Sequence, residues 1–266
     1  MKIRLDGMTW PEVEEALRKP NAVIVPTGST EQHGLHLPLN VDACCATHMA
    51  EQAARKVNDE HQIRVIVAPT ISYGETTTFS LAGFTGTIGV SVDTMIRVIE
   101  DIARNFITQG FKNIIFVNGH AENIIPISTA LKKLSIDYPD AGLYALNWWA
   151  LGFEVVPEVC ESKIRLHADE VETSVSLVIQ PENVYLDKAV AEYPVYSLSE
   201  KWVFPDFYGA NRVFYHSRKK FPIRAKGNPG VMGDATVASK EKGEKIIKAV
   251  VDNLAEIIVE VVQSEQ

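Results

Sequence analysis

The fold of this chain is decided by residues 21–42, which read Asn-Ala-Val-Ile-Val-Pro-Thr-Gly-Ser-Thr-Glu-Gln-His-Gly-Leu-His-Leu-Pro-Leu-Asn-Val-Asp. The stretch begins as a short apolar run of the kind that buried strands show, and the run breaks at Pro26. Glu31 and His33 follow this break. Because they lie two residues apart, their side chains point to the same side of an extended backbone. Such a pair, followed by the carboxylate of Asp42, can close around one or two divalent metal ions.

A second acid–histidine pair, His120 and Glu122, follows a second apolar run in the same way. Each pair taken alone has an ordinary alternative, because loop residues of these types often hydrogen-bond exposed backbone and His120 can sit on the rim of a tight turn. Asp42 has one as well, as an acid favoured by the positive end of a helix dipole. Together, two pairs and an aspartate supply the ligands that two cations require, so we predict a metal centre.

The rest of the chain alternates apolar strands with helical patterns. Strands are predicted at residues 22–27, 64–68, 113–117 and 142–147, and helices at 8–18, 42–57, 93–110, 123–135, 171–179 and 235–262. The segment 73–89 is rich in glycine and threonine and is predicted to be a loop. Strands without alternation, separated by helices, are typical of a parallel sheet covered on both faces, which makes the fold class α/β. Ligands bind such sheets beyond the carboxyl ends of the strands, where both acid–histidine pairs fall.

Helix ends carry their own signals. Thr9 and Glu12 have the spacing of a capping box at the start of the first helix. Asp93 is predicted to cap the helix that begins there, and Gly110 to end it.

Composition narrows the class of protein. The 266 residues are near the upper limit for one domain and contain no low-complexity linker, so we expect a single domain over residues 1–266. The formal net charge of −8 argues against a nucleic acid or an anionic membrane as partner. No apolar run reaches the ~18–20 residues of a membrane helix, and no apolar signal core opens the chain. The three cysteines give neither a disulfide framework nor a Cys-x-x-Cys site, which fits the reducing cytoplasm.

The motifs as a set resemble the creatininase (creatinine amidohydrolase) family of metal-dependent hydrolases. The first motif is long and specific, two others support it in the right order, and together the matches run from residue 20 to about 245. The matching segments are residues 26–42, 110–123 and 167–174, with 84–88 similar to a glycine–threonine loop of the family and 230–238 to its late glycine–aspartate segment.

This resemblance implies a three-layer α/β/α fold with a mostly parallel central sheet. It also implies two divalent metal ions per subunit, zinc or manganese, in a homo-oligomer that is often a hexamer. One ion would be held by Glu31, Asp42 and His120, and the other by His33, Asp42 and Glu122. A bridging Asp42 is physically reasonable, because a shared carboxylate offsets the repulsion between cations about 3.5–4 Å apart.

The implied activity is hydrolysis of a small cyclic amide, with a creatinine-like C–N bond attacked by a metal-activated water. We expect His167, Glu172 and Glu122 to carry the catalysis. His167 is the candidate general acid, because an imidazole near its ordinary pKa can hold and release a proton. Its alternative is a plain histidine near a helix start. Glu172 is either the partner of His167 or a residue around the metal.

Pocket and supporting residues follow from the same resemblance. Trp149 matches a pocket tryptophan, Thr87 falls in the glycine–threonine loop, and both are expected to contact substrate. His36 and Asn118 are expected to support the ligands from behind. Creatinine-cleaving members have a further tryptophan shortly before the catalytic histidine, and residues 161–166 contain none, which argues against creatinine itself.

Other substrates and one other class of protein remain open. The same centre would serve a formamide deformylase or an enzyme that cleaves a carbon–carbon bond in a cyclic polyol ketone. Lys163 or Arg165 would favour an anionic or hydroxyl-rich substrate. The basic run 218–226 is interpreted as a solvated or subunit-contacting loop. The alternative class is a binding protein with a structural metal site, although a structural ion rarely needs open positions.

Overall fold

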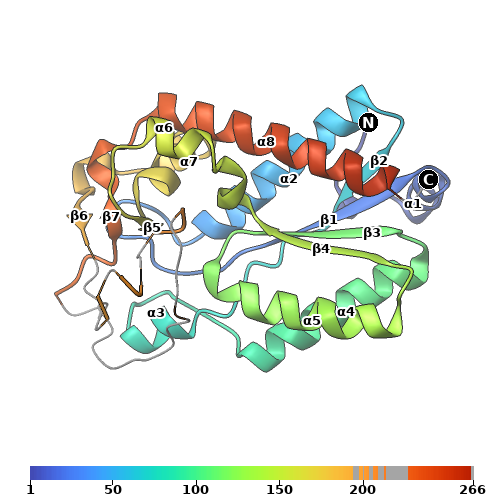
Figure 1. Cartoon of the computed structure of the whole chain (residues 1–266), viewed down its shortest axis with the longest axis horizontal. Coiled ribbons are helices and arrows are strands. Elements are labelled where there is room, and N and C mark those ends of the chain that lie inside the picture. Colours follow the sequence, from blue (N-terminus) through green and yellow to red (C-terminus); the bar gives the residue numbers. More distant parts are fainter. Residues whose placement is uncertain (194–197, 200, 204–205, 209–212, 214–226, 265–266) are drawn as a thin grey trace.

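A parallel sheet forms the centre of the computed structural model (Figure 1). The structure describes residues 1–193, 198–199, 201–203, 206–208, 213 and 227–264, so the basic run 218–226 lies outside the described residues. Four strands pair in the order β2-β1-β3-β4, all parallel. Their bounds are β1 (Asn21–Thr27), β2 (Arg64–Val67), β3 (Asn113–Asn118) and β4 (Gly142–Asn147).

Side chains of successive strand residues enter two different cores, because they alternate across the sheet. In β1, Ala22 and Ile24 face one core and Val23 and Val25 face the other, and all four are fully buried. A strand buried on both faces needs a continuous apolar run, which explains why the sequence predicted these strands closely.

Helices cover both faces of the sheet and give three layers (Figure 1). The predicted α/β/α arrangement with a parallel central sheet is therefore confirmed. One face packs against α2, α7 and α8, and the other against α1, α4 and α5. The bounds are α1 (Trp10–Leu17), α2 (Val41–Glu60), α4 (Val92–Gln109), α5 (Ile124–Asp137), α7 (Glu170–Ile179) and α8 (Lys240–Gln263).

Helix caps mostly follow the sequence signals. The capping box of Thr9 and Glu12 is present, with the Thr9 N–H donating to Glu12 Oε2 at 2.7 Å. Gly110 ends α4 in the left-handed region with φ 100°. The cap of α4 is Ser91 rather than Asp93, because the Ser91 hydroxyl accepts the N–H of Thr94 and leaves Asp93 in the first turn.

Three parts of the chain differ from the predictions. The segment 73–89 contains a short helix, α3 (Thr77–Ala82), and is not loop throughout. The last helix begins at Lys240 behind a Ser239 cap, and Ala235–Val237 form a separate 3-10 turn. A small antiparallel sheet was not predicted: it pairs β5 (Arg165–His167), β7 (Met232–Asp234) and β6 (Ala191–Glu192). The remaining short helix is α6 (Val155–Val159).

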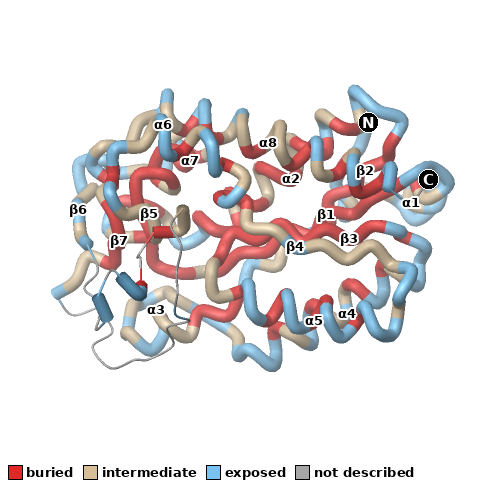
Figure 2. Tube along the Cα trace, in the orientation of Figure 1, coloured by how far each residue is buried: buried red, intermediate tan, exposed pale blue. Residues whose placement is uncertain are grey.

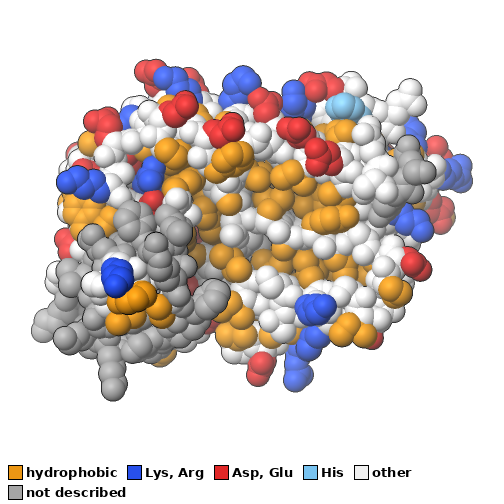
Figure 3. Space-filling view, in the orientation of Figure 1, with side chains coloured by type: hydrophobic (Ala, Val, Ile, Leu, Met, Phe, Trp, Pro, Cys, Tyr) orange, Lys and Arg blue, Asp and Glu red, His pale blue; other side chains and the backbone are white. Residues whose placement is uncertain are grey.

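The antiparallel sheet lies beyond the carboxyl ends of the parallel strands, at the left of Figure 1. The trace between the two sheets is largely buried (Figure 2). By contrast, β4 is an edge strand whose residues are half-buried or exposed, and hydrophobic side chains gather over it between α8 and α5 (Figure 3). In the described ranges, no helix combines the length and apolar character needed to cross a bilayer.

Candidate metal centre

Asp42 is held at the rim of the sheet between two strand ends. Gly28 follows β1 and Gly119 follows β3, and both contact the first turn of α2. A Cβ added to Gly28 would lie 2.3 Å from Ala43 N, and one added to Gly119 would lie 2.1 Å from the main-chain oxygen of Asp42. Because no side chain fits at either glycine, main-chain contacts fix where the Asp42 carboxylate stands.

A first cluster consists of Glu31, Asp42 and His120, all buried. His120 Nδ1 lies 3.4 Å from Glu31 Oε1 and 3.2 Å from Asp42 Oδ2. Its other ring nitrogen, Nε2, lies 2.7 Å from the main-chain oxygen of Glu75. A carbonyl oxygen can only accept, so Nε2 donates there and leaves Nδ1 to face the carboxylates as a ligand would.

A second cluster consists of His33, Asp42 and Glu172. His33 Nε2 lies 3.1 Å from Asp42 Oδ1 and 3.7 Å from Glu172 Oε2. The opposite nitrogen, Nδ1, lies 3.1 Å from the main-chain oxygen of Glu31 and donates to it. Asp42 therefore gives one carboxylate oxygen to each cluster.

The donor atoms fit divalent cations. Glu31 Oε1 and Asp42 Oδ2 are buried and have no hydrogen-bond partner among the described residues, which is costly for carboxylate oxygens unless a cation faces them. Two ligands about 2.1 Å from one tetrahedral ion lie about 3.4 Å apart. The four histidine–carboxylate separations in the two clusters run from 3.1 to 3.7 Å, which is close to that value.

Charge within the clusters shifts their titration strongly. Burial lowers the pKa of His33, but Asp42 and Glu172 outweigh it and raise that pKa to about 10. The pKa of His120 shifts in the same direction. Burial lowers this pKa, but Glu31 and Asp42 outweigh burial and raise it well above the ordinary value. Burial raises the pKa of Glu172 to about 8, although His33 acts against it. Cations at these positions would therefore replace protons.

Glu122, expected as a ligand, lies outside both clusters. Its carboxylate accepts the main-chain N–H of Thr78 at 3.2 Å and the Thr78 hydroxyl, and Oε2 is 3.9 Å from His120 Nε2, on the far side of that ring from Nδ1. Burial raises its pKa. The structure brings Glu172, not Glu122, to His33 and Asp42.

His167 is placed beside the ligands by β5. Its ring stacks on Phe79 of α3, with centroids 4.4 Å apart and planes at 24°, and also touches the ring of His33 at 4.4 Å. Its Nδ1 lies 3.7 Å from Glu31 Oε1. Its Nε2 lies 2.9 Å from both the main-chain oxygen and the side-chain nitrogen of Gln32. Burial, reinforced by His33, lowers its pKa well below the ordinary value, so the imidazole is neutral at neutral pH.

The turn after β5 links His167 to Glu172. Ala168 has φ 48° and is the one described non-glycine residue with positive φ. Its N–H donates to Glu172 Oε2 at 2.5 Å. Backbone held in this region is strained and tends to occur at functional sites.

Asn118 and Thr87 bond main-chain groups of the motifs, whereas His36 contacts a side chain. Asn118 Nδ2 donates to the main-chain oxygen of His120 at 2.7 Å. His36 Nε2 lies 2.8 Å from the Thr173 hydroxyl, and burial lowers the His36 pKa to about 4. Thr87 accepts the N–H of Gln32 at 3.0 Å, so in the structure it holds the first motif.

Three partners of the centre were not predicted from the sequence. Gln32 contacts His167 and also donates to Gly230 O at 3.0 Å. Phe79 and Thr76 come from the segment predicted to be loop, where Thr76 donates its hydroxyl to Glu31 Oε2. Gln32 is identified by its place between Glu31 and His33 in the sequence. Phe79 and Thr76 are identified by their contacts with His167 and Glu31 in the fold.

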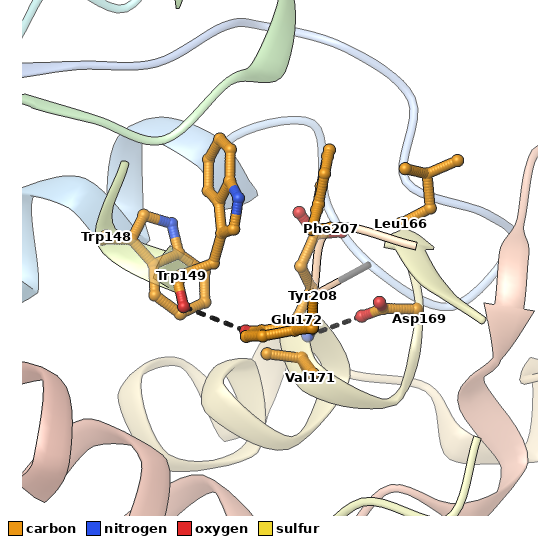
Figure 4. A pocket seen from close by; sticks show the side chains of 8 residues that line it. All are labelled: Trp148, Trp149, Leu166, Asp169, Val171, Glu172, Phe207 and Tyr208. Atoms are coloured by element: carbon orange, nitrogen blue, oxygen red, sulfur yellow. Dashed lines mark hydrogen bonds between the residues drawn. The ribbon is translucent and has the colours of Figure 1, made fainter. Parts of the chain in front are cut away.

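A small pocket adjoins the second cluster (Figure 4). Trp149, predicted to contact substrate, is one of its lining residues and stacks on Phe207 at 4.8 Å and 22°. Glu172 forms part of the same wall. Arg165, considered above for an anionic substrate, is instead paired with Asp206 at 2.8 Å.

Comparison with known proteins gives relatives of several activities. The chain is 31% identical over 268 residues to 3-dehydro-scyllo-inosose hydrolase of Thermotoga maritima, covering 96% of this chain and 82% of that protein. It is 28% identical over 266 residues to creatinine amidohydrolase of Pseudomonas putida, covering 94% of each. It is 28% identical over 238 residues to mycofactocin precursor peptide peptidase of Mycolicibacterium smegmatis, covering 89% and 83%.

Solved structures share the fold over nearly the whole chain. A creatinine amidohydrolase aligns with TM-score 0.78 at 25% identity, covering 97% of both chains. A manganese creatininase aligns with TM-score 0.80 at 24% identity, and a mutant creatininase of Zn–Zn type with 0.77 at 26%, each covering 98% of both chains.

The sequence model of one family, Creatininase, described as creatinine amidohydrolase, matches residues 6–258. With this match over most of its length, and with relatives that are hydrolases, the chain belongs to the creatininase family.

Proposed function

We propose that this protein is a metal-dependent hydrolase that cleaves a small cyclic molecule at a carbonyl group, with a creatinine-like cyclic amide as the first candidate substrate. The observation that carries the proposal is the pair of clusters sharing Asp42. A structural site usually closes around one ion, whereas here two clusters adjoin and a small pocket lies against one of them.

Two divalent cations would be held by Glu31, Asp42 and His120 and by His33, Asp42 and Glu172. Zinc and manganese are the first choices, because relatives of known structure are named for those forms. When bound, such ions polarise a carbonyl and make water acidic enough to ionise near neutral pH. Glu122 remains a proposed member of the centre, but it would have to leave Thr78 to reach it.

His167 is proposed to move the proton. Its neutral imidazole can take a proton from the attacking water and then give it to the leaving nitrogen, as a general base and then a general acid. The stack on Phe79 and the contacts with Gln32 hold the ring in one plane. The Ala168 N–H, which donates to Glu172, holds the adjoining carboxylate.

A cyclic polyol ketone is the second candidate substrate. Two observations favour it: the relative at 31% identity is named for hydrolysis of an inosose, and residues 161–166 contain no tryptophan to close over a creatinine ring. The same centre would serve, because a ketone and an amide present the same carbonyl to water.

The test combines metal analysis with a substrate panel. Protein loaded with zinc or manganese is assayed on creatinine and other lactams, formamides and inososes, beside a His167→Gln variant and the exposed-site control His61→Gln. We expect two ions per chain and turnover on one substrate class. His167→Gln should lower that turnover by roughly 10²–10⁴-fold with both ions retained.

Two results would contradict the proposal. Full metal loading without turnover on any class would favour a binding protein with structural ions. Loss of an ion in His167→Gln would make His167 a ligand, consistent with its position in a third group with Glu31 and His33, and would remove it from proton transfer.

A further inference from the structure

Three buried carboxylates, Glu170, Asp206 and Asp169, lie near one another, and the first two are paired with cationic side chains. Glu170 accepts from Lys242 Nζ at 2.5 Å and from the main-chain N–H groups of Glu161 and Ser162. Asp206 accepts from the guanidinium of Arg165 at 2.8 and 3.1 Å. A buried carboxylate usually requires such partners, because transfer out of water is costly for a charge.

The third carboxylate, Asp169, has no such partner. It is 2% exposed and lines the pocket, and no lysine or arginine among the described residues contacts it. Its Oδ1 accepts the N–H of Glu172 at 3.0 Å, which caps α7. Figure 4 shows the side chain on the pocket wall opposite Trp149.

Capping alone does not require an aspartate here. Asparagine and serine cap helices about as well as aspartate does, and neither brings a full carboxylate into a buried position. Asp169 accepts main-chain N–H groups of Glu172 and Val171, and a carboxylate on the pocket wall can accept a further donor from a group that enters the pocket.

The surroundings limit what that group can be. The other walls include Trp149, Phe207 and Leu166, which are apolar, and Glu172, which is acidic. Arg165 is not a lining residue: it pairs with Asp206 and lies over the Tyr208 ring at 4.9 Å. Apart from the ion proposed at the second cluster, an anion would meet carboxylates, whereas an O–H or N–H donor would meet an acceptor.

We propose that Asp169 is a specificity-determining residue, whose carboxyl accepts an O–H or N–H group of a neutral or cationic substrate lying beside Trp149 and Phe207. This inference rests on the proposed function, since it places the reacting carbonyl toward Glu172. It names the substrate class shared by cyclic amides and cyclic polyol ketones, which both carry such donors.

Binding of three probes of the same shape tests the proposal. Acetamidinium, acetamide and acetate differ in charge and in donors but hardly in size. Their dissociation constants are measured by ligand-observed NMR with zinc-loaded protein, for the wild type, Asp169→Asn and Asp234→Asn. Asp234 is the matched control, because it also caps a turn, accepting from Thr236 N at 2.9 Å, but does not line the pocket.

We expect Asp169→Asn to weaken acetamidinium roughly tenfold or more, to weaken acetamide less, and to leave acetate unchanged or tighter. Asp234→Asn should change none of the three. Asp169→Ser, which also preserves the cap, repeats the measurement if Asp169→Asn does not fold. Unchanged acetamidinium binding, or an equal loss for acetate, would overturn the assignment.

The readout separates this inference from the proposed function. Probe binding needs no turnover, so dependence on Asp169 in a protein without activity would remove the hydrolase proposal alone. If turnover is found and its KM is the same in Asp169→Asn, the specificity role fails and the hydrolase stands. A rise in KM with little change in kcat supports both.

Discussion

The two clusters share a carboxylate but are built differently. The first joins side chains that follow β1 and β3 to the start of α2, so the rim of the parallel sheet holds every member. The second needs Glu172, which comes from α7 after the turn at Ala168. A rigid sheet edge thus defines one cluster, and a strained turn completes the other.

The clusters also differ in what they face. The Glu31 side chain is fully buried, whereas that of Glu172 is 12% exposed and lines the pocket. We infer that the first cluster anchors the centre and that the second meets the substrate. Substitutions at the two should therefore separate metal retention from chemistry.

The largest effect is expected from Asp42→Asn, because Asp42 belongs to both clusters. Both ions should be lost, and turnover should fall by more than the roughly 10²–10⁴-fold that loss of a proton-transfer group costs. Metal content per chain and turnover measure this, with the exposed Asp59→Asn on the same helix as control. Retention of one ion in Asp42→Asn would contradict the proposal that the Asp42 carboxylate ligates both ions.

Comparing the metal affinities of Glu172→Gln and Glu122→Gln tests which of the two glutamates is a ligand of the second cluster. Glu172→Gln should release one ion of two, with a loss of affinity beyond the roughly 10- to 100-fold that an outer hydrogen-bond partner costs. Glu122→Gln should stay within that range. Competitive chelator titration gives both affinities. The reverse order would restore Glu122 as the ligand of that ion.

The pH dependence of metal binding should distinguish the clusters. An ion in the second cluster displaces protons from His33, with pKa about 10, and from Glu172, with pKa about 8. An ion in the first displaces one from His120, whose pKa is raised too, while the pKa of Asp42 is lowered despite burial, mainly by His33.

Apparent affinity therefore rises with pH at both clusters, and below pH 8 it rises more steeply at the second, by about tenfold per unit for each proton released. Titration calorimetry of Glu172→Gln and wild type in buffers of different ionisation enthalpy counts these protons. Equal proton release in the two proteins would show that the ion of the second cluster displaces no proton from Glu172.

Ala168→Gly should have the smallest effect. Glycine relieves the positive φ but adds freedom to the unfolded chain, so stability should stay within about 1 kcal/mol of the wild type. The looser turn should weaken the second ion and lower turnover severalfold. Thermal unfolding and the two metal affinities test this. An equal loss at the first cluster would mean that the turn supports the whole centre.

The sequence predicted the parallel sheet well and its surroundings less well. The strands are continuous apolar runs, so their limits agree to within about a residue, as for β4 at residues 142–147. The strands β5, β6 and β7 have two or three residues each and show no period. In α3, threonine and serine at half of the positions give little helix signal, and the flanking glycines favour a loop.

The candidate site shows the same division. Glu31, His33, Asp42 and His120 converge as their motifs suggested, since strand ends meet at one rim. The pair His120 and Glu122 was interpreted by the alternation of an extended chain, but a 3-10 turn begins at Ala121 and carries Glu122 to the other side of the ring. Glu172, which the motif at 167–174 left open as a partner of His167 or a residue around the metal, lies in the second cluster instead, through packing between segments far apart in sequence.

The contact between Gly119 and the peptide of Asp42 has a consequence for how such centres change. A methyl group there could not be absorbed by a neighbouring side chain, because what it meets is main chain that carries the shared carboxylate. Gly119→Ala would therefore weaken the binding of both ions at once, although Gly119 has no side-chain atom that could ligate a metal. In redesign of this protein for a new reaction, substitutions in the turn at Ala168 should be tolerated best. Gly28 and Gly119, which contact the main chain at Asp42 and Ala43, should be kept.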